Sequence, residues 1–192
     1  MIIRAGLPAS DRDAAATLYW QAFGQKLARV MGPDAKALRY IIRVMRTDHV
    51  IAAHANDGTL LGVVGFKSHD GAFVDGTFHD LRAIYGRAGA LWRAALLSLL
   101  ERDIDNARFL LDGLCVAPTA RGQGIGTALL DAICTEARTR GYAKVRLDVI
   151  DTNPRARALY TRYGFRATNT QTIGPLSYIF GFTSSTTMVK TL

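Results

Sequence analysis

The feature that most constrains the fold is a glycine-rich turn in the second half of the chain. Residues 117–132, APTARGQGIGTALLDA, place three glycines at alternate positions where an apolar segment gives way to a helical pattern. Glycine adopts positive φ easily and lets another group approach the backbone closely. The preceding residues 108–116 predict a strand, 123–140 a helix and 143–150 another strand. This succession predicts a right-handed βαβ unit.

The flanking segments predict antiparallel neighbours for this unit. Residues 1–7 predict a strand, and 48–57 and 58–74 predict two strands joined by a hairpin at Asn56-Asp57-Gly58. Helices are predicted over 13–27, from behind Gly32-Pro33 to residue 46, over 81–103 with a break near Gly86 or Gly89, and over 153–164. Further strands are predicted from about residue 165 and near 186–189. The predicted fold is one α/β domain over residues 1–192, with a mixed, mostly antiparallel twisted sheet, one central βαβ unit and helices on both faces.

Composition excludes a disordered chain and favours an anionic ligand. The 192 residues are 49% hydrophobic and 21% charged, which suffices for a packed core. Of the 24 basic residues 19 are arginine, and the net charge is +8. Arginine suits forked contacts with phosphate or carboxylate. The alternative is that these arginines follow genomic base composition and are simply solvated.

The remaining residue types point to a cytoplasmic, metal-free protein. Cys115 and Cys134 have neither disulfide nor metal spacing. The start of the chain has no apolar run typical of a signal peptide. The most apolar window, 91–100, contains Arg93 and is far shorter than the ~20 residues of a membrane span. No metal spacing relates the four histidines, His49, His54, His69 and His79.

Two common nucleotide loops can be tested directly against the glycines. A Rossmann fingerprint requires glycine where this chain has Thr127, and a Walker loop requires a lysine that is absent here. The remaining interpretation is a strand-to-helix turn with Arg121 at its edge. Its first helical N–H groups, in residues 123–127, form an anion site suited to phosphate or pyrophosphate. The alternative is a tight structural turn with a solvated arginine.

A second segment, residues 153–165, reads NPRARALYTRYGF. Asn153 followed by Pro154 suits a helix N-cap and first turn, and Gly164 suits a helix end. Taken alone, this pattern makes Asn153 a cap and Tyr160 a buried aromatic residue with a polar tip.

Together, the two segments resemble the GNAT superfamily of acyl-CoA-dependent N-acyltransferases. Residues 121–126 match its pyrophosphate motif, Arg/Gln-x-x-Gly-x-Gly/Ala. The second segment matches a further family pattern at Asn153, Ala156, Leu159, Tyr160, Gly164 and Phe165. The resemblance is strong over residues 109–166 and extends over the first hundred residues only in the order of elements.

The resemblance implies acetyl-CoA as co-substrate. It assigns the pyrophosphate to the backbone N–H groups of residues 123–127, and the pantetheine arm to the strand edge at residues 114–116. It assigns Tyr160 the role of protonating the departing thiolate. The residues expected to contact the cofactor are Leu114, Cys115, Val116, Arg121, Gly122, Gln123, Gly124, Ile125, Gly126, Thr127, Asn153 and Tyr160.

The general base is not fixed by the motifs. Asp112 is embedded in the apolar segment FLLDGLCV, where a carboxylate requires an explanation. It is the candidate base, and the alternatives are that it anchors a loop or that a water relay replaces it. Asp148 is a fainter candidate. Cys115 suggests a covalent intermediate, but it has no evident histidine partner, and a buried cysteine is usually a small hydrophobic residue.

The predicted function is transfer of an acetyl group to a primary amine by direct attack in a ternary complex. The alternative is a module that binds CoA as a sensor without catalysis. Nucleic-acid binding is disfavoured because the basic residues are scattered and no recognition motif is present, and no membrane partner is expected. Analogy suggests a homodimer. Small amines, antibiotics, amino acids and proteins all remain open as acceptors.

Overall fold

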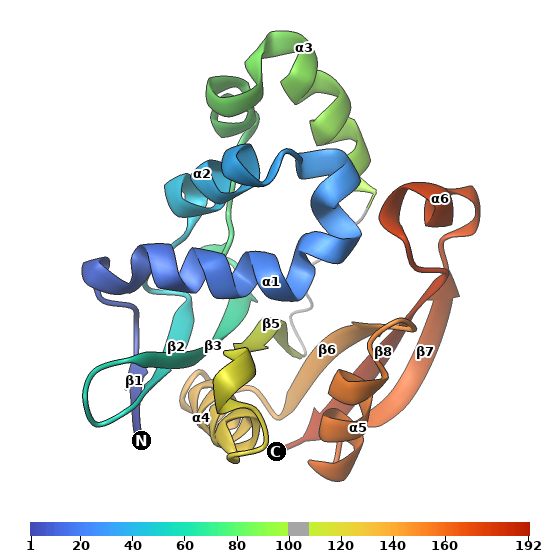
Figure 1. Ribbon diagram of the computed structural model, residues 1–192. Coiled ribbons are helices and arrows are strands. Elements are labelled where there is room, and N and C mark those ends of the chain that lie inside the picture. Colours follow the sequence, from blue (N-terminus) through green and yellow to red (C-terminus); the bar gives the residue numbers. More distant parts are fainter. Residues whose placement is uncertain (100–107) are drawn as a thin grey trace.

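The computed structural model describes residues 1–99 and 108–192 (Figure 1). The strands are β1 Ile2–Ala5, β2 Val50–His54, β3 Leu60–Ser68, β4 Gly71–Ala72, β5 Phe109–Val116, β6 Lys144–Ile150, β7 Arg166–Thr172 and β8 Ser184–Thr191. The helices are α1 Arg12–Met31, α2 Asp34–Val44, α3 Phe78–Ser98, α4 Ile125–Thr139, α5 Pro154–Arg162 and α6 Ser177–Phe180. Single 3₁₀ turns cover Ala9–Asp11, Pro118–Ala120 and Gly174–Leu176.

The strands form one mixed sheet in the order β1-β2-β3-β5-β6-β8-β7, with β4 added to β3. Only β5 and β6 run parallel among the strand pairs of the described residues. Helix α4 connects these two strands, as predicted for the βαβ unit. The predicted hairpin between β2 and β3 is also present. The predicted fold class is therefore confirmed.

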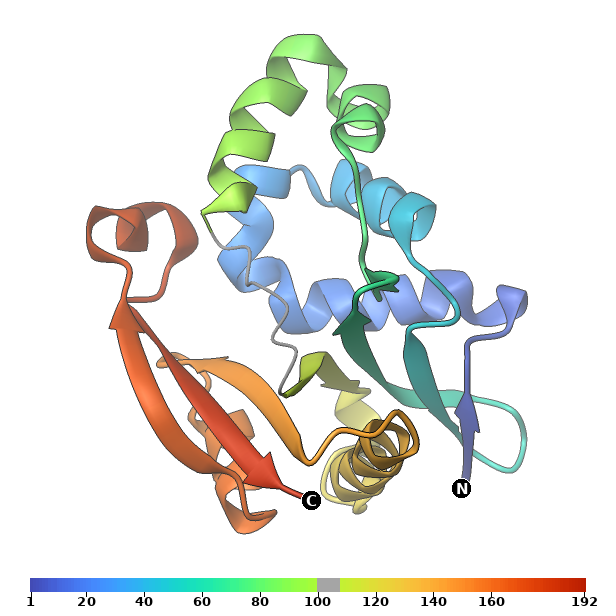
Figure 2. The ribbon, with the colours of Figure 1, turned by 180° about the vertical axis from the view of Figure 1, so that it is seen from behind.

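The sheet is divided between β5 and β6. These strands pair only at Phe109–Val145 and Leu110–Arg146, whereas β6 pairs with β8 over its whole length. Beyond Leu110 the two strands diverge, so that β6, β8 and β7 form a separate wing (Figures 1 and 2). On the side facing β6, residues 111–116 of β5 pair with no strand of the described residues. Both cavities described below lie at this division.

Helices cover the two faces of the sheet, and each buries an apolar stripe. Helix α4 buries Leu129, Leu130 and Ile133 completely against one face. Helices α1 and α2 cover the opposite face, and α3 lies above them, away from the sheet (Figure 1). Contacts among α1, α2 and α3 form an apolar cluster of their own, which includes Val30 and Leu81.

The element boundaries differ from the predictions where tertiary packing decides them. Helix α1 continues to Met31 because Val30 and Met31 are buried against α3. Helix α3 begins at Phe78, where a capping box between Thr77 and Asp80 stabilises its first turn. It is broken at Gly86, as predicted, but residues 100–103 of the predicted helix lie outside the described residues.

Two further differences from the predictions concern the first and last strands. Strand β1 ends at Ala5, before Gly6 with its φ of +84°, and β8 is longer than residues 186–189. Asp11 occupies the N-cap position of α1 but makes no capping hydrogen bond. Its carboxylate instead lies 2.7 Å from Nε2 of the buried His54. Within residues 1–99 and 108–192, none of the helices combines the length and apolar character that a membrane span requires.

Candidate active site

The glycine-rich turn leads directly into the N-terminus of α4. Gly124 is the N-cap residue, with φ of +80°. The first backbone hydrogen bond of the helix runs from the N–H of Ala128 to the carbonyl of Gly124, at 3.0 Å. The N–H groups of the three residues between them, 125–127, therefore have no acceptor within the helix. Because the helix dipole adds partial positive charge there, this end of α4 suits an anion.

The three glycines of the turn serve two different purposes. Gly122 and Gly124 have positive φ, and a Cβ on either would meet no protein atom within 4 Å. These two residues shape the turn. A Cβ on Gly126 would lie 3.0 Å from Cδ2 of Leu159, so this glycine lets α4 pack closely on α5.

The segment after β6 forms α5 as its sequence predicts. The side chain of Asn153 accepts a hydrogen bond from the N–H of Ala156 at 3.1 Å, which confirms its role as N-cap. The ring of Tyr160 packs edge-on against Phe165, with centroids 5.9 Å apart, and Tyr160 is only 7% exposed. Its hydroxyl makes no hydrogen bond to the described residues. Burial raises the pKa of Tyr160, so the phenol stays protonated at neutral pH.

A cavity of about 740 Å³, called the donor cavity here, lies between the start of α4, strand β5 and helix α5, with α1 alongside. Eleven of the twelve residues predicted to contact the cofactor line it. The exception is Gln123, whose exposed side chain donates to the carbonyl of Thr119 at 3.2 Å.

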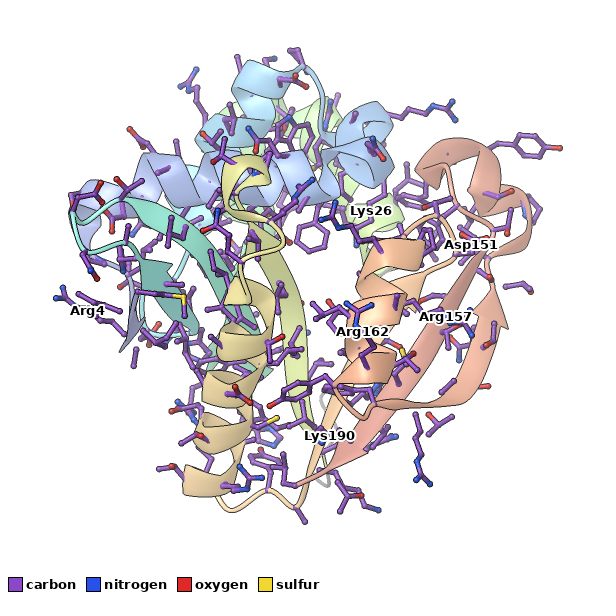
Figure 3. All side chains as sticks on the ribbon, turned by 60° about the horizontal axis from the view of Figure 1, so that its bottom comes forward. Arg4, Lys26, Asp151, Arg157, Arg162 and Lys190 are labelled. Atoms are coloured by element: carbon purple, nitrogen blue, oxygen red, sulfur yellow. The ribbon has the colours of Figure 1, made fainter. Side chains whose placement is uncertain are left out.

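The walls of the donor cavity are cationic. Lys26, Arg121, Arg155 and Arg162 contribute to them, and the described lining residues include no acidic side chain. Figure 3 shows Arg162 on the side of α5 that faces α4, and Lys26 reaching from α1 toward α5. This charge favours a ligand with several negative groups.

Two parts of this lining were not expected from the sequence. Helix α1 contributes Gln21, Ala22, Gln25 and Lys26, and the segment around α6 contributes Phe180 and Gly181. The four α1 residues occur at spacings of one, three and four, which place them on one face of a helix. This mainly polar stripe on α1 is the sequence pattern from which its contribution to the cavity could have been predicted.

A second cavity of about 480 Å³, called the acceptor cavity here, lies next to the first. Lys26 and Ile150 line both. Strand β5 lines both cavities: Leu110, Leu111 and Asp112 line the second, whereas the residues from Leu114 onward line the first. Most of the acceptor cavity's other lining residues are apolar and come from α1, α2 and α3.

The two candidate bases, Asp112 and Asp148, both line the acceptor cavity but differ in their partners. Within the described part of the chain, the carboxylate of Asp112 has neither a hydrogen bond nor an ion pair. Burial raises its pKa, and the nearby charges of Lys26 and Lys67 partly oppose this effect. In contrast, Asp148 lies 3.3 Å from Nη2 of Arg146 and accepts a hydrogen bond from the hydroxyl of Thr187. The structure therefore leaves Asp112 available to a ligand.

Tyr19 of α1 is a polar residue of this cavity that the sequence analysis did not identify. Burial, and then the charge of Asp112, raise the pKa of Tyr19 well above its ordinary value. Its hydroxyl thus stays protonated near Asp112, and it forms no hydrogen bond with the described residues. The ring of Tyr19 packs against the rings of Phe23 and Phe73, with centroids 4.5 and 5.9 Å apart, and these contacts hold Tyr19 in place.

Cys115 is poorly suited to nucleophilic attack. It is 3% exposed, and burial raises the pKa of its thiol to about 12. At neutral pH the sulfur is therefore protonated and weakly reactive. The rings of the buried His49 and His54 contact other residues than Cys115. His49 contacts Asp48 and Ser68, and His54 contacts Asp11. His69 and His79 are exposed.

Comparison with known proteins identifies the family. Residues 13–165 match the model of the acetyltransferase (GNAT) family. The chain belongs to this family. The predicted resemblance is thus confirmed.

Individual relatives agree with this assignment. The chain is 36% identical over 121 residues to mycothiol acetyltransferase of Beutenbergia cavernae, a match that covers 55% of this chain but only 39% of that protein. An N-acetyltransferase from Staphylococcus aureus Mu50 has the same fold, with a TM-score of 0.68 and 15% identity over 99% of this chain and all of that one. A GNAT family acetyltransferase from Elizabethkingia anophelis with acetyl-CoA bound gives a TM-score of 0.50 and 16% identity, over 74% of this chain and 75% of that one.

Proposed function

We propose that this protein is an N-acetyltransferase that transfers the acetyl group of acetyl-CoA to a primary amine, and that residues 1–192 form one such domain. The observation that carries the proposal is the pair of neighbouring cavities along β5. One has a helix N-terminus and four cationic side chains, and the other has a carboxylate without a described partner. An anionic donor and an amine acceptor fit these two environments separately.

The residues of the donor cavity fit coenzyme A group by group. The free N–H groups of residues 125–127 suit the pyrophosphate, and Lys26, Arg121, Arg155 and Arg162 suit its further negative charge. The open edge of β5 at residues 114–116 suits the amide groups of the pantetheine arm, by β-strand addition. The bound acetyl-CoA in the Elizabethkingia anophelis protein, which shares the fold, supports this choice of donor.

Tyr160 is the proposed proton donor to the departing thiolate. Its raised pKa keeps the phenol protonated, and its hydroxyl has no described competing partner. Transfer to an ordinary thiolate with a pKa near 8.5 would be uphill. However, burial raises the pKa of the neighbouring Cys115 thiol to about 12. Burial of the departing sulfur would raise its pKa in the same direction and make proton transfer from Tyr160 less unfavourable.

Asp112 is the proposed base. An amine enters as its ammonium form and must lose a proton before its nitrogen can attack the thioester carbon. Asp112 and Leu114 are two residues apart on β5, which corresponds to about 6–7 Å along the strand. One water molecule can bridge this separation and carry the proton. The C–N bond forms as the C–S bond breaks, the nitrogen releases its second proton to solvent water, and Tyr160 protonates the sulfur. Tyr160 then regains a proton from solvent water, and Asp112 returns its proton to solvent.

Direct transfer is favoured over a covalent enzyme intermediate. The protonated, buried thiol of Cys115 is a poor nucleophile, and no histidine among the described residues contacts it. An amine that attacks the donor itself needs both substrates bound together. The two adjoining cavities meet this requirement.

The test is turnover of acetyl-CoA with a panel of primary amines, followed by thiol release and by mass spectrometry of the product. We expect a saturable rate that depends on both substrates. Tyr160→Phe should lower kcat while leaving the affinity for CoA unchanged, because the ring and its packing remain. Binding of CoA without turnover of any amine would instead favour a sensor or presenting module. A protein that binds no CoA ester would refute both.

A further inference from the structure

We propose that the acceptor is a small primary amine carried at the end of a compact apolar body, such as an arylalkylamine. This inference rests on the proposed function and specifies its substrate class. The observation behind it is the uneven distribution of polar groups in the acceptor cavity. Its end at β5 contains the carboxylate of Asp112, which has no partner among the described residues, whereas its opposite part lies among the apolar side chains of the helices.

The polar end suits one ammonium group. Asp112 and the protonated hydroxyl of Tyr19 lie close together there, and neither makes a hydrogen bond with the described residues. The only other carboxylates in the described lining are Asp148, which is already bound by Arg146 and Thr187, and Asp75, whose side chain is 48% exposed. Asp112 is therefore the interior anchor for a cationic nitrogen, and Tyr19 can accept or donate a hydrogen bond beside it.

The opposite part of the cavity suits an apolar body. Its walls include Leu27 and Met31 of α1, and Leu81, Ala94 and Leu97 of α3. These residues belong to the apolar cluster of the three N-terminal helices or pack against it. The exposed ring of Phe78 also borders this cavity. A ligand gains here by removing apolar surface from water.

The same lining disfavours two other acceptor classes. A peptide carries an N–H and a C=O at every residue, and each needs a partner when buried. In the helical part of the cavity, apart from Tyr19 and Lys26, the described side chains that could serve are Trp20, Tyr40 and Ser98. A polyamine carries several positive charges, but Asp148 is already paired with Arg146, and Asp75 lies 4.0 Å from Arg46. The described lining thus leaves one carboxylate, that of Asp112, which suits a single ammonium group.

The first experiment compares acceptors at fixed acetyl-CoA. We would measure kcat/KM for phenethylamine, methylamine, phenylalanine, spermidine and a tetrapeptide with N-terminal alanine. We expect phenethylamine to exceed methylamine by about 100-fold, because the apolar body contributes several methylene equivalents. Phenylalanine should be a poorer acceptor than phenethylamine, since its carboxylate is placed beside Asp112. Preference for the tetrapeptide, for spermidine or for phenylalanine would overturn the inference and leave the proposed function intact.

The second experiment uses neighbouring residues of α3. Ala94 lines the acceptor cavity, whereas Ala95 is exposed and lies outside its lining. Ala94→Phe should shorten the cavity and raise KM for phenethylamine by about tenfold or more, with little change for methylamine. Ala95→Phe should leave both KM values unchanged. Circular dichroism and CoA binding verify that each variant is folded.

The outcomes separate the two proposals. Acetylation of amines without any preference for an apolar body, or equal effects of Ala94→Phe and Ala95→Phe, would refute the acceptor class alone. Failure of every amine to react, with CoA bound normally, would refute the proposed function and the acceptor class with it. If Ala94→Phe is unfolded, Ala94→Leu gives a smaller obstruction and the same expected direction.

Discussion

The donor and acceptor cavities lie next to each other along the same strand, but they are built in different ways. Apart from the contribution of α1 and α6, the donor cavity is formed by two continuous segments, 114–127 and 150–162. Its anion site consists of backbone N–H groups at the start of α4. The acceptor cavity is assembled from side chains of α1, α2, α3, β5 and β6, among other elements. Its polar chemistry depends on a few isolated groups such as Asp112.

Because of this difference, the two cavities restrict the amino-acid sequence to different degrees. A backbone anion site requires glycine at particular φ values and a helix that begins at a particular residue, so its sequence is restricted. A cavity wall of side chains tolerates many apolar substitutions of similar volume. The donor cavity can therefore be recognised from a sequence motif. The side chains of the acceptor cavity can change, and the substrate with them, without a change of fold.

The largest expected effect is that of removing the interior base. Asp112→Asn should lower kcat by about 100-fold or more, as is typical for loss of general-base catalysis. The affinity for CoA should remain, because Asp112 lies outside the donor cavity. The matched variant is Asp148→Asn, whose carboxylate is already engaged by Arg146 and Thr187. It should destabilise the wing of β6 and β8 with little effect on kcat. Steady-state kinetics that rank the two variants in reverse order would assign the base to Asp148.

The next effect concerns the backbone of the donor site. Gly124→Ala forces an L-residue into φ of +80°, which costs about 1–2 kcal/mol. Relaxation of this strain would turn the N–H groups of residues 125–127 away from the pyrophosphate, and we expect CoA binding to weaken about tenfold. Gly141→Ala is the matched control, because Gly141 has φ of +81°, equally open surroundings and a position at the far end of α4. Calorimetry should show a similar loss of stability but unchanged CoA binding. Equal loss of CoA affinity in both would indicate a global effect.

Local sequence rules predicted several local features. Asn153 caps α5 and the break at Gly86 divides α3, because short-range hydrogen bonding and φ preferences decide these features. Helix α4 begins at Ile125, two residues later than predicted, after Gly124 at positive φ. Asp112 was identified because a carboxylate in an apolar strand is unusual. These conclusions required neither long-range contacts nor knowledge of the partner strands.

The features that the sequence did not predict depend on distant packing. The extension of α1 to Met31 requires α3, which stabilises Val30 and Met31 by burial. Tyr19 and Lys26 face the cavities only because α1 crosses the sheet beside the division of β5 from β6. The different states of Asp112 and Asp148 depend on whether Arg146 and Thr187 lie nearby. No local pattern in the sequence reports these neighbours.

A smaller effect of the Asp112→Asn substitution is expected on stability, and its pH dependence separates this effect from the loss of activity. Burial raises its folded-state pKa above the unfolded value, so the protonated form favours folding. This contribution is fully present below the unfolded pKa and is lost as pH rises through the folded pKa. At neutral pH the ionised Asp112 therefore costs stability, and Asp112→Asn should raise Tm. The gain should disappear in acid, where wild-type Asp112 is also neutral. Thermal unfolding measured against pH tests this, and a gain that persists at low pH would contradict it.

The smallest expected effect comes from the cationic rim of the donor cavity. Arg162 lines this cavity, whereas Arg157 lies outside the described lining and on the opposite side of the same short helix (Figure 3). Arg162→Gln should weaken CoA binding several-fold, since exposed charge pairs contribute up to about 1 kcal/mol. Added salt should reduce the difference between variant and wild type, because it screens the same interaction. Arg157→Gln removes an identical charge from α5 and should leave the Kd for CoA nearly unchanged. Titration calorimetry at low and high salt distinguishes the two cases: equal weakening by both substitutions would mean that the net charge of α5, and not the position of Arg162, attracts the donor.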